Sequence, residues 1–388
     1  MKVVHIISGL GVGGAEKMLL KIVREHQKKN IATEIISLGT LGLVGGELRK
    51  QGIIVHVVGA EGRRIPSVGE ILRFTHIVRR IAPNVIQGWM YHGNLAALLA
   101  KCIIWPTPAL VWNIRQTLGA LEHEVRLTRL VIKFSARVSR FADKIVYNAI
   151  DSEKQHIRIG YTPNNSTFIP NGFDLHDFGP RNAQREEERR NLGIKSDDIL
   201  VGHVGRYHAK KDHHRFFEAI SEVLKKKNNL YVVAFGRKVS RTNQALAEQL
   251  NKDPNQDRIF LMGERTDLRP SYQALDILVS SSSWGEGFSN ILGEGMASEL
   301  VCVATNIGEA ARLIGGAGIL VKPNDATAMA KAIIDVATMP AEVRRDIGVE
   351  ARKRIEKDYS IEVVASQYLD LYLSLRPTSS ASETGFSA

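Results

Sequence analysis

The chain has 388 residues, of which 44% are hydrophobic and 24% charged, as expected for a soluble globular protein large enough for two α/β domains. A net charge of +11 and a pI near 9.6 favour an anionic partner: a nucleic acid, a membrane surface or a phosphorylated substrate. No stretch is apolar for long enough to span a bilayer, and the N-terminus lacks the apolar core of a signal peptide.

The two cysteines, Cys102 and Cys302, lie far apart inside apolar segments. We therefore expect two buried free thiols and a reducing compartment, the cytoplasm. Neither cysteine has the spacing of a metal ligand, and the sequence predicts no metal site and no cofactor.

The first strand, Val3 to Ser8, runs into a glycine-rich loop, Gly9 to Lys17, that opens a helix. The loop contains G-x-G-x-x-G, the fingerprint of dinucleotide-binding enzymes, which predicts an NAD-binding oxidoreductase. That fingerprint requires an acid at the end of the second strand, and here the second strand ends in Gly39-Thr40. The missing acid disfavours the oxidoreductase, although glycines in such a loop still let the backbone approach a diphosphate.

Two polar residues follow later strands of this half. His92 comes where the strand at 84–87 gives way to a helix, and Arg115 follows the strand at 110–114. In an open parallel sheet this edge faces the ligand. A lone histidine is more often structural, so the position of His92 alone does not assign it a role. Arg115 is a candidate for contact with the acceptor of a transferred group.

The expected helix at 124–144 carries two neighbouring stripes, one basic and one apolar. The basic stripe is Arg126, Arg129, Lys133, Arg137 and Arg140, and the apolar stripe is Leu127, Val131, Phe134, Val138 and Phe141. One interpretation is an apolar face packed on the core with a solvated basic flank. The other is a surface that docks on anionic lipid.

The second half opens with a strand at 199–204 that leads into Gly205-Arg206, and a helix follows Lys211-Asp212. The preceding segment, 181–190, is highly charged, and we expect it to be exposed. Arg206 and Lys211 lie five residues apart in one strand-to-helix loop, so they can converge on one anion. Arginine offers phosphate a planar fork and lysine a point charge.

A buried strand starting at Asp276 leads into the stretch on which the functional prediction rests, Trp284 to Ala297. Glu286 and Gly287 lie in its strand-to-helix loop, where free backbone N–H groups and the helix dipole favour an anion. Glu294 lies eight residues after Glu286, about two helical turns along, and should face the same side. Two carboxylates so placed suit the hydroxyls of a sugar and a ribose.

Four motifs together resemble one family. They are Glu286-x7-Glu294, G-R-x4-K-D at 205–212, G-G-A-E at 13–16 and I-P-N-G at 169–172. This pattern is similar to that of the retaining GT-B glycosyltransferases of family 4, the glycosyl transferases group 1. The resemblance covers both halves of the chain.

The resemblance implies an α/β protein of the GT-B fold, with two Rossmann-like domains facing each other across a cleft. The N-terminal, acceptor-side domain is expected at 1–175 and the C-terminal, nucleotide-sugar-binding domain at 190–360. A last helix at 361–375 should return to the first domain, and the polar segment 376–388 should form a disordered tail.

The resemblance also implies roles for individual residues. Arg206 and Lys211 would hold the nucleotide diphosphate, Glu286 and His92 would face the donor sugar, and Glu294 would hold the ribose. We take Glu286, Lys211, Arg206 and His92 as the catalytic candidates. The other candidates bind substrate: Gly13, Gly14, Arg115, Arg265, Gly287, Phe288, Ser289, Asn290 and Glu294.

The function so implied is retaining transfer of a sugar from a nucleotide-diphosphate sugar, with UDP favoured, to a hydroxyl of a glycan or lipid-linked acceptor. The sequence contains no D-x-D motif, so we expect a metal-independent reaction. One alternative is a nucleotide-sugar epimerase of the same architecture. The others are the NAD-binding oxidoreductase and a non-catalytic binder.

The expected partners are therefore the nucleotide-sugar donor, the acceptor and an anionic membrane surface at the 124–144 helix. Aromatic residues make up only 6% of the chain, and no array for stacking on bases is visible, so a nucleic acid is not expected. The expected location is cytoplasmic, peripheral at the inner face of the membrane.

Overall fold

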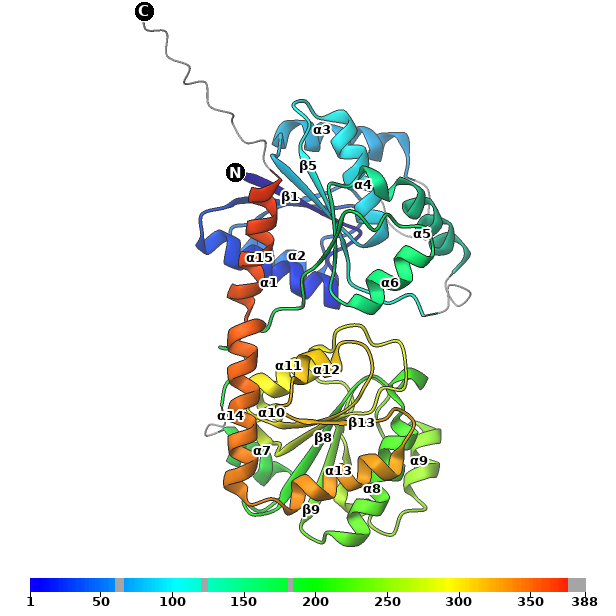
Figure 1. The fold of residues 1–388 in the computed structure, drawn as a ribbon, viewed down its shortest axis with the longest axis vertical. Helices are drawn as coiled ribbons and strands as arrows, with labels where there is room; N and C mark the ends of the chain where they lie inside the picture. The colour runs from blue at the N-terminus through cyan, green and yellow to red at the C-terminus, as the bar shows by residue number, and fades with distance from the viewer. Residues whose placement is uncertain (60–65, 120–124, 181–183, 376–388) are drawn as a thin grey trace, which may run out of the picture.

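The computed structural model describes residues 1–59, 66–119, 125–180 and 184–375. Its two halves lie one above the other, each built on a parallel sheet with helices on both faces (Figure 1). The segment 376–388, predicted to be a disordered tail, lies outside the described residues.

The first sheet has seven parallel strands in the order β3-β2-β1-β4-β5-β6-β7. They are β1 (Lys2–Ile7), β2 (Ala32–Ser37), β3 (Ile54–Val57), β4 (Val85–Trp89), β5 (Ala109–Ile114), β6 (Lys144–Tyr147) and β7 (Ser166–Phe168). The helices that follow these strands are α1 (Gly14–Lys28), α2 (Gly42–Lys50), α3 (Val68–Ile81), α4 (Met90–Ile103), α5 (Arg126–Val138) and α6 (Ile150–Arg158). The order in which strands are added reverses between β1 and β4: β2 and β3 lie on one side of β1, and β4 to β7 lie on the other. A crevice forms at such a switch point.

The second sheet has six parallel strands in the order β10-β9-β8-β11-β12-β13. They are β8 (Ile199–Val204), β9 (Leu230–Phe235), β10 (Ile259–Leu261), β11 (Ile277–Ser280), β12 (Val301–Thr305) and β13 (Ile319–Val321). Its helices are α7 (Gln184–Asn191), α8 (His213–Lys226), α9 (Gln244–Leu250), α10 (Arg269–Ala274), α11 (Asn290–Ala297), α12 (Ala310–Ile314), α13 (Ala326–Thr338) and α14 (Ala341–Asp358). Here the switch point lies between β8 and β11, so the loops after these two strands meet.

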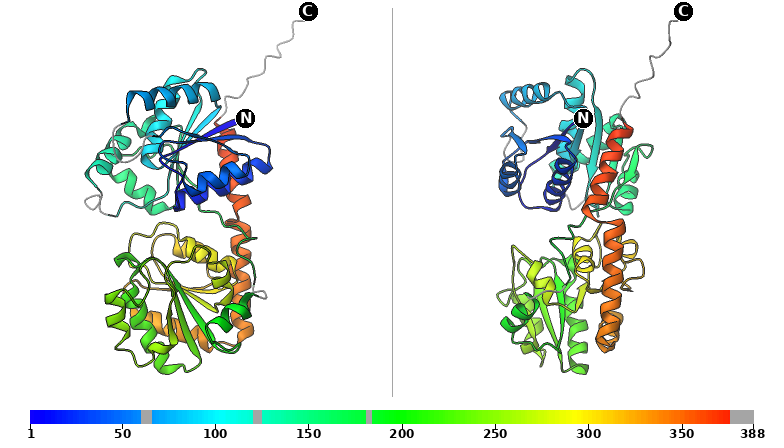
Figure 2. Two further views of the ribbon diagram at one scale, coloured as in Figure 1. Left: turned by 180° about the vertical axis from the view of Figure 1, so that it is seen from behind. Right: turned by 90° about the vertical axis from the view of Figure 1, so that its left-hand side faces the viewer.

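The last helix, α15 (Ile361–Ser374), lies end to end with α14 along one side of the molecule (Figure 2). It packs against α1 and completes the core of the first half. The apolar residues that it contributes are Ile361, Val364, Tyr368 and Tyr372. The core of the first half is therefore built from residues at both ends of the described chain.

Two chain segments cross between the halves, and they run side by side. Phe173 donates its backbone N–H to the Tyr359 carbonyl, and Ile361 donates to the Phe173 carbonyl, both at 2.9 Å. The ring of Phe173 also fills the space beside Gly293 on α11, where a Cβ would lie only 1.9 Å from the ring. The crossing thus consists of two chain segments that are hydrogen-bonded to each other and packed against α11.

Three expectations from the sequence are wrong. The helix predicted at 124–144 is shorter: α5 ends at Val138, and a 3-10 turn over Ser139–Phe141 leads into β6. The buried Ser139 side chain stabilises the C-terminal end of α5, because its hydroxyl donates to the Ala136 carbonyl at 2.7 Å. Cys102 is exposed, whereas Cys302 is buried as expected. Arg189, in the run expected to be exposed, is buried against Asp276.

Candidate active site

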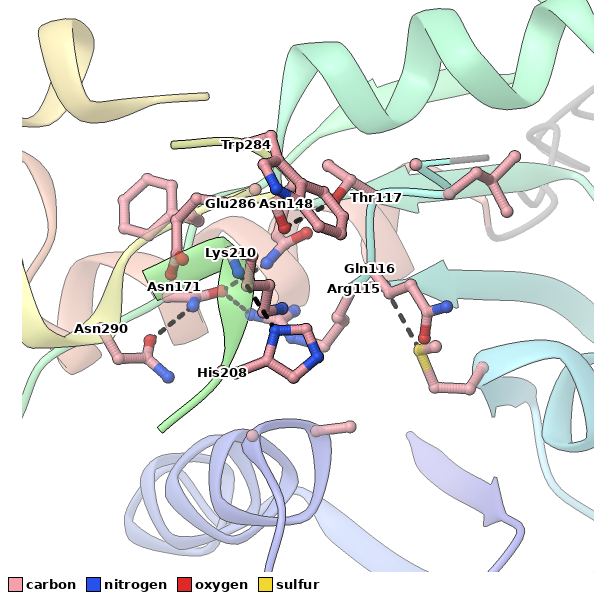
Figure 3. A pocket seen from close by; sticks show the side chains of 18 of the residues that line it. Arg115, Gln116, Thr117, Asn148, Asn171, His208, Lys210, Trp284, Glu286 and Asn290 are labelled. Atoms are coloured by element: carbon pink, nitrogen blue, oxygen red, sulfur yellow. Dashed lines mark hydrogen bonds between the residues drawn. The ribbon is translucent and has the colours of Figure 1, made fainter. Parts of the chain in front are cut away.

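A cavity of about 900 Å³ lies between the halves, where the loops at the carboxyl ends of both sheets face each other (Figure 3). The first half contributes Gly14, Ala15, Glu16, Met90, Arg115, Gln116, Thr117, Leu118, Gly119, Asn148 and Asn171. The second half contributes Arg206, His208, Lys210, Trp284, Gly285, Glu286, Gly287, Phe288 and Asn290. The two switch points thus open onto one space, as expected for open parallel sheets.

Lys211 and Glu286 form an ion pair at the meeting of the β8 and β11 loops. Lys211 Nζ lies 2.7 Å from Glu286 Oε2, and each side chain is 16% exposed. The hydroxyl of Ser282 donates to the same carboxylate oxygen at 3.1 Å. The ammonium and the carboxylate therefore hold each other in place through a charge-assisted hydrogen bond.

Two buried histidines support the loop that carries Lys211. The rings of His203 and His213 are 4.7 Å apart, and His213 Nε2 donates to the Gly205 carbonyl at 3.2 Å. His203 Nε2 lies 3.0 Å from Ser281 Oγ, which itself donates to the Lys211 carbonyl. Burial lowers the pKa of His213 to about 4, so the ring is neutral near pH 7.

This burial predicts a loss of stability in acid. The unfolded chain takes up a proton at His213 near pH 6.5, whereas the folded chain does so only near pH 4. Stability should therefore fall as pH drops through this window, by about 2 kcal/mol at pH 4.5 from this group alone. Urea unfolding at pH 7 and 4.5 would measure it. The His213→Gln variant should lose less stability on acidification than the native chain; an equal loss would contradict the assignment.

The loop that holds Glu286 is tightly confined. Ser289 caps α11, with its hydroxyl accepting from the Leu292 N–H at 3.5 Å, and Phe288 is buried. On the other side, Gly308 has a φ of +57°, and a Cβ there would lie 2.2 Å from the Glu286 carbonyl oxygen. The backbone of the loop that follows β12 thus fixes the position of residues 286–287.

Two hydrogen bonds join cavity-lining residues of the two halves, and a third joins Ile150 to Glu309 outside that lining. Thr117 Oγ1 donates to the Gly285 carbonyl at 3.1 Å. Asn171 Nδ2 donates to Asn290 Oδ1 at 2.6 Å. The backbone N–H of Ile150, in the first turn of α6, donates to Glu309 Oε1 at 2.7 Å. The buried Glu309 carboxylate thus lies at a helix N-terminus of the opposite half, where the dipole favours negative charge.

Arg115 lines the cavity but is tied into a network that reaches α15. It donates to the Tyr368 hydroxyl at 3.0 Å and also to Asn171 Oδ1. Asn113 Nδ2 donates to the same tyrosine hydroxyl at 2.8 Å. The guanidinium also lies over the Trp89 ring, 5.7 Å from its centroid. Arg115 is therefore held by the protein on several sides, beside Asn171, which lies two residues before Phe173 in the crossing segment.

Several predicted site residues lie outside the cavity lining. His92 is exposed in the first turn of α4, and Gly13 precedes α1. The Glu294 carboxylate accepts a hydrogen bond from the Tyr272 hydroxyl at 2.9 Å. Burial raises the pKa of Glu294, and the positive charge of Lys21 is the main influence that lowers it. Arg265 donates to Glu188 at 3.0 Å and lies over the Phe235 ring. Glu294 and Arg265 thus lie outside the cavity lining.

Residues without a predicted role complete the lining. His208, Lys210 and Trp284 belong to the same two loops as Arg206 and Glu286. Their membership of those loops was a signal that sequence reasoning could have used, because loops that share a switch point share a ligand. Glu309 had no comparable signal. No cluster of three or more His, Cys, Asp or Glu side chains that could hold a metal occurs in the described parts of the chain.

Comparison with known proteins gives matches along most of the chain. The model described as Glycosyltransferase Family 4 matches residues 12–177, and that described as Glycosyl transferases group 1 matches residues 198–339. The putative glycosyltransferase EpsF of Bacillus subtilis is 22% identical over 327 residues, 79% of each chain. The D-inositol 3-phosphate glycosyltransferase of Corynebacterium urealyticum is 27% identical, covering 95% of this chain and 92% of its own.

Solved structures show the same fold. HepE of Anabaena, crystallised with UDP, superposes with a TM-score of 0.82 at 20% identity, covering 97% of this chain and all of its own. Sucrose-phosphate synthase of Thermosynechococcus elongatus superposes with a TM-score of 0.76 at 16% identity, covering 97% and 99%. These matches confirm the predicted GT-B fold and the predicted enzyme class. The chain belongs to the GT-B glycosyltransferases of family 4, the glycosyl transferases group 1, and is a glycosyltransferase.

Proposed function

We propose that the enzyme transfers a sugar from a UDP-sugar to a hydroxyl of a glycan or lipid-linked acceptor, with retention of configuration and without a metal ion. The observation that carries the proposal is the ion pair between Lys211, which lies outside the cavity lining, and Glu286, which lines the interdomain cavity. It brings a cation for the departing diphosphate and a carboxylate for the sugar hydroxyls to one place.

The donor lies along the second half in this proposal. Arg206, which lines the cavity, and Lys211 hold the diphosphate, and Glu286 accepts hydrogen bonds from the sugar. Glu294 holds the ribose, and the loop of Arg265 lies at the base. This order follows the roles that the family resemblance implies, and Glu294 and Arg265 lie outside the cavity lining.

The chemistry is a displacement at the anomeric carbon on one face of the sugar. The bond between this carbon and the diphosphate oxygen breaks, and its electron pair stays on the phosphate. The acceptor oxygen forms the new bond, and its proton passes to the leaving phosphate oxygen. Preorganised cations stabilise the charge that develops on that oxygen. Glu286 is committed to Lys211 and Ser282, which supports a positioning role rather than nucleophilic attack.

A UDP donor is supported by the related HepE structure, in which UDP is bound. We expect UDP to raise the melting temperature of this protein more than GDP, ADP or NAD does, because a ligand that binds only the folded state stabilises it by mass action. A thermal-shift panel with these four ligands measures this. A shift with another nucleoside diphosphate alone would reassign the base, and a shift with NAD alone would contradict the transferase site.

A membrane-bound acceptor is supported by the surface of α5. The side chains that α5 buries are Ile132, Ser135 and Ala136. Of the apolar stripe, Val131 and Val138 pack against the core, whereas Leu127, Phe134 and Phe141 are exposed. Leu130 is 65% exposed and Phe134 53%, next to the basic stripe. An exposed apolar ridge beside arginine and lysine suits the interface of an anionic bilayer. Among the described residues, no helix has the length and apolarity needed to cross a membrane.

The position of α5 in the chain links this surface to the cavity. Gly119, which lines the cavity, precedes the start of α5 at Arg126 by seven residues. The helix proposed to hold a lipid-linked acceptor, α5, is therefore close in sequence to the part of the cavity wall at 115–119. This supports the proposed location, cytoplasmic and peripheral at the inner face of the membrane.

Charge reversal tests the membrane proposal. Changing Arg129, Lys133 and Arg137 to Glu should abolish co-sedimentation with vesicles of phosphatidylglycerol and phosphatidylcholine, since each basic residue near an anionic surface contributes about 1 kcal/mol. The matched control reverses Lys225 and Lys226 at the end of α8 and Lys227 directly after it, an equal change in net charge elsewhere. The proposal would be contradicted if the α5 variant bound the vesicles as the native protein does, or if the control variant lost binding equally.

A further inference from the structure

One edge of the cavity has no role once the donor is placed. It is formed by Trp284, Lys210 and His208, which come from the loops after β11 and β8 (Figure 3). The cavity volume of about 900 Å³ is near the upper end of the roughly 300–1,000 Å³ typical of small-molecule pockets. Because Glu294 and Arg265, which are assigned to the nucleoside, do not line the cavity, we infer that it has room for more than a diphosphate and one sugar. The remaining space adjoins Trp284.

Lys210 is a cation without an acidic partner among the residues that the structure describes. Its neighbour Lys211 is paired with Glu286, whereas the Lys210 stem runs past Gly285, where a Cβ would lie 3.9 Å from Lys210 Cδ. The Lys210 carbonyl accepts from the Ser283 N–H at 2.9 Å, which ties its backbone to the Trp284 loop. Burial, and then Lys211 and Arg206, lower the pKa of Lys210, and only Glu286 opposes this. A bound anion would relieve that repulsion.

His208 presents a hydrogen-bond donor on the same edge. Its Nδ1 accepts the backbone N–H of Lys210 at 3.2 Å, so the ring proton of the neutral form is on Nε2. Burial and the three neighbouring cations lower the pKa of His208, which keeps the ring neutral. Lys210 and His208 together therefore offer an ammonium and one fixed N–H, a combination that suits the several acceptor oxygens of a phosphate.

Trp284 provides an apolar face beside these donors. Its side chain is 48% exposed although it lines the cavity, and its ring centroid is 6.4 Å from that of His208. Across from it lies Gly119, where a Cβ would lie 4.0 Å from the indole. An exposed indole in a polar cavity buries large apolar area against the C–H face of a ligand such as a sugar ring.

We propose that Trp284, Lys210 and His208 form an acceptor subsite for a phosphorylated sugar, with the indole against the sugar ring and the two basic side chains on the phosphate. A phosphate carries more charge than the carboxylate of an acidic sugar, and so matches this edge better. The inference rests on the proposed transferase function, because it assumes that UDP fills the donor site. The phosphate has two candidate sources, a soluble sugar phosphate and a lipid diphosphate-linked sugar.

Binding measurements on the UDP-saturated protein test the subsite. By calorimetry, glucose 1-phosphate should bind at least tenfold more tightly than methyl glucoside. Lys210→Met, which keeps the stem, should abolish this preference and leave UDP affinity within twofold, while Trp284→Ala should weaken both sugars. The control Lys225→Met, on the exposed face of α8, should change nothing. If only a polyprenyl diphosphate-linked sugar in detergent shows the dependence on Lys210, the lipid source is supported.

Two outcomes would overturn the inference, and they differ from failure of the proposed function. The subsite is wrong if neither phosphorylated sugar depends on Lys210 while UDP binds normally. It is also wrong if Lys210→Met weakens UDP tenfold, since Lys210 would then serve the donor diphosphate. If UDP itself fails to bind the native protein, the proposed function fails first, before either sugar is tested.

Discussion

Replacing Lys211 with alanine should lower turnover at least a hundredfold while the protein stays folded. The ammonium lies 2.7 Å from Glu286, in the loop that faces the proposed diphosphate. Removing it takes away a cation that stabilises charge on the leaving group, and loss of one such preorganised donor lowers the rate by about 10²–10³. Among the residues that the structure describes, it also leaves Ser282 as the remaining hydrogen-bond donor to the Glu286 carboxylate. UDP release from a panel of UDP-sugars measures the effect.

Two variants make this result specific. Lys211→Arg keeps the charge and should recover part of the activity, and Lys225→Ala removes an exposed lysine paired with Glu222 and should be neutral. The melting temperature of the alanine variant should stay within about 2 °C of the native value, which corresponds to roughly 1–2 kcal/mol for a protein of this size. Near-native turnover in a folded Lys211→Ala protein would refute the catalytic role.

Gly308→Ala should be nearly as damaging, although residue 308 touches no substrate in the proposed complex. A Cβ at Gly308 would lie 2.2 Å from the Glu286 carbonyl oxygen and 2.5 Å from that of Gly287. The loop must therefore move, and Glu286 moves with it. We expect turnover to fall at least a hundredfold, since a displacement of about 1 Å has that effect. The free energy of unfolding should fall by about 2–4 kcal/mol.

Gly316→Ala separates steric collision from backbone conformation. Gly316 also has a left-handed φ, +93°, but a Cβ there would meet nothing within 4 Å. This control should lose about 1–2 kcal/mol of stability through conformation alone and keep its turnover. Steady-state kinetics and urea unfolding of both variants make the comparison. Equal activity in the two would show that the Gly308 contact does not position the loop.

The alternation of strands and helices made most of the fold predictable. Buried parallel strands appear as short apolar runs, and their loops carry the polar residues. This is why the sequence could place Arg206, Lys211 and Glu286 in loops at the carboxyl-terminal edge of the second sheet. Their mutual contacts could not be predicted, because Lys211 and Glu286 are 75 residues apart and only the switch point between β8 and β11 brings them together.

Other features depend on tertiary packing contacts that the spacing of apolar residues in the sequence does not indicate. The two stripes of α5 were visible in the sequence, but small residues, Ser135 and Ala136, face the core, because close packing on α4 favours them. Arg189 lies in a charged run, yet it is buried, since Asp276 accepts from it in the interior. Cys102 lies in an apolar segment but points outward. Each depends on a neighbour distant in sequence.

The position of α15 bears on how the protein is made. Its apolar side chains finish the core of the first half, yet α15 starts at Ile361, roughly 190 residues after the first crossing near Pro170. A ribosome that adds about 5–20 residues per second needs roughly 10 to 40 s to make that interval. Throughout it, the apolar groove that α15 will cover stays open on the nascent chain. The sequence that is translated last thus decides when the half translated first can finish folding.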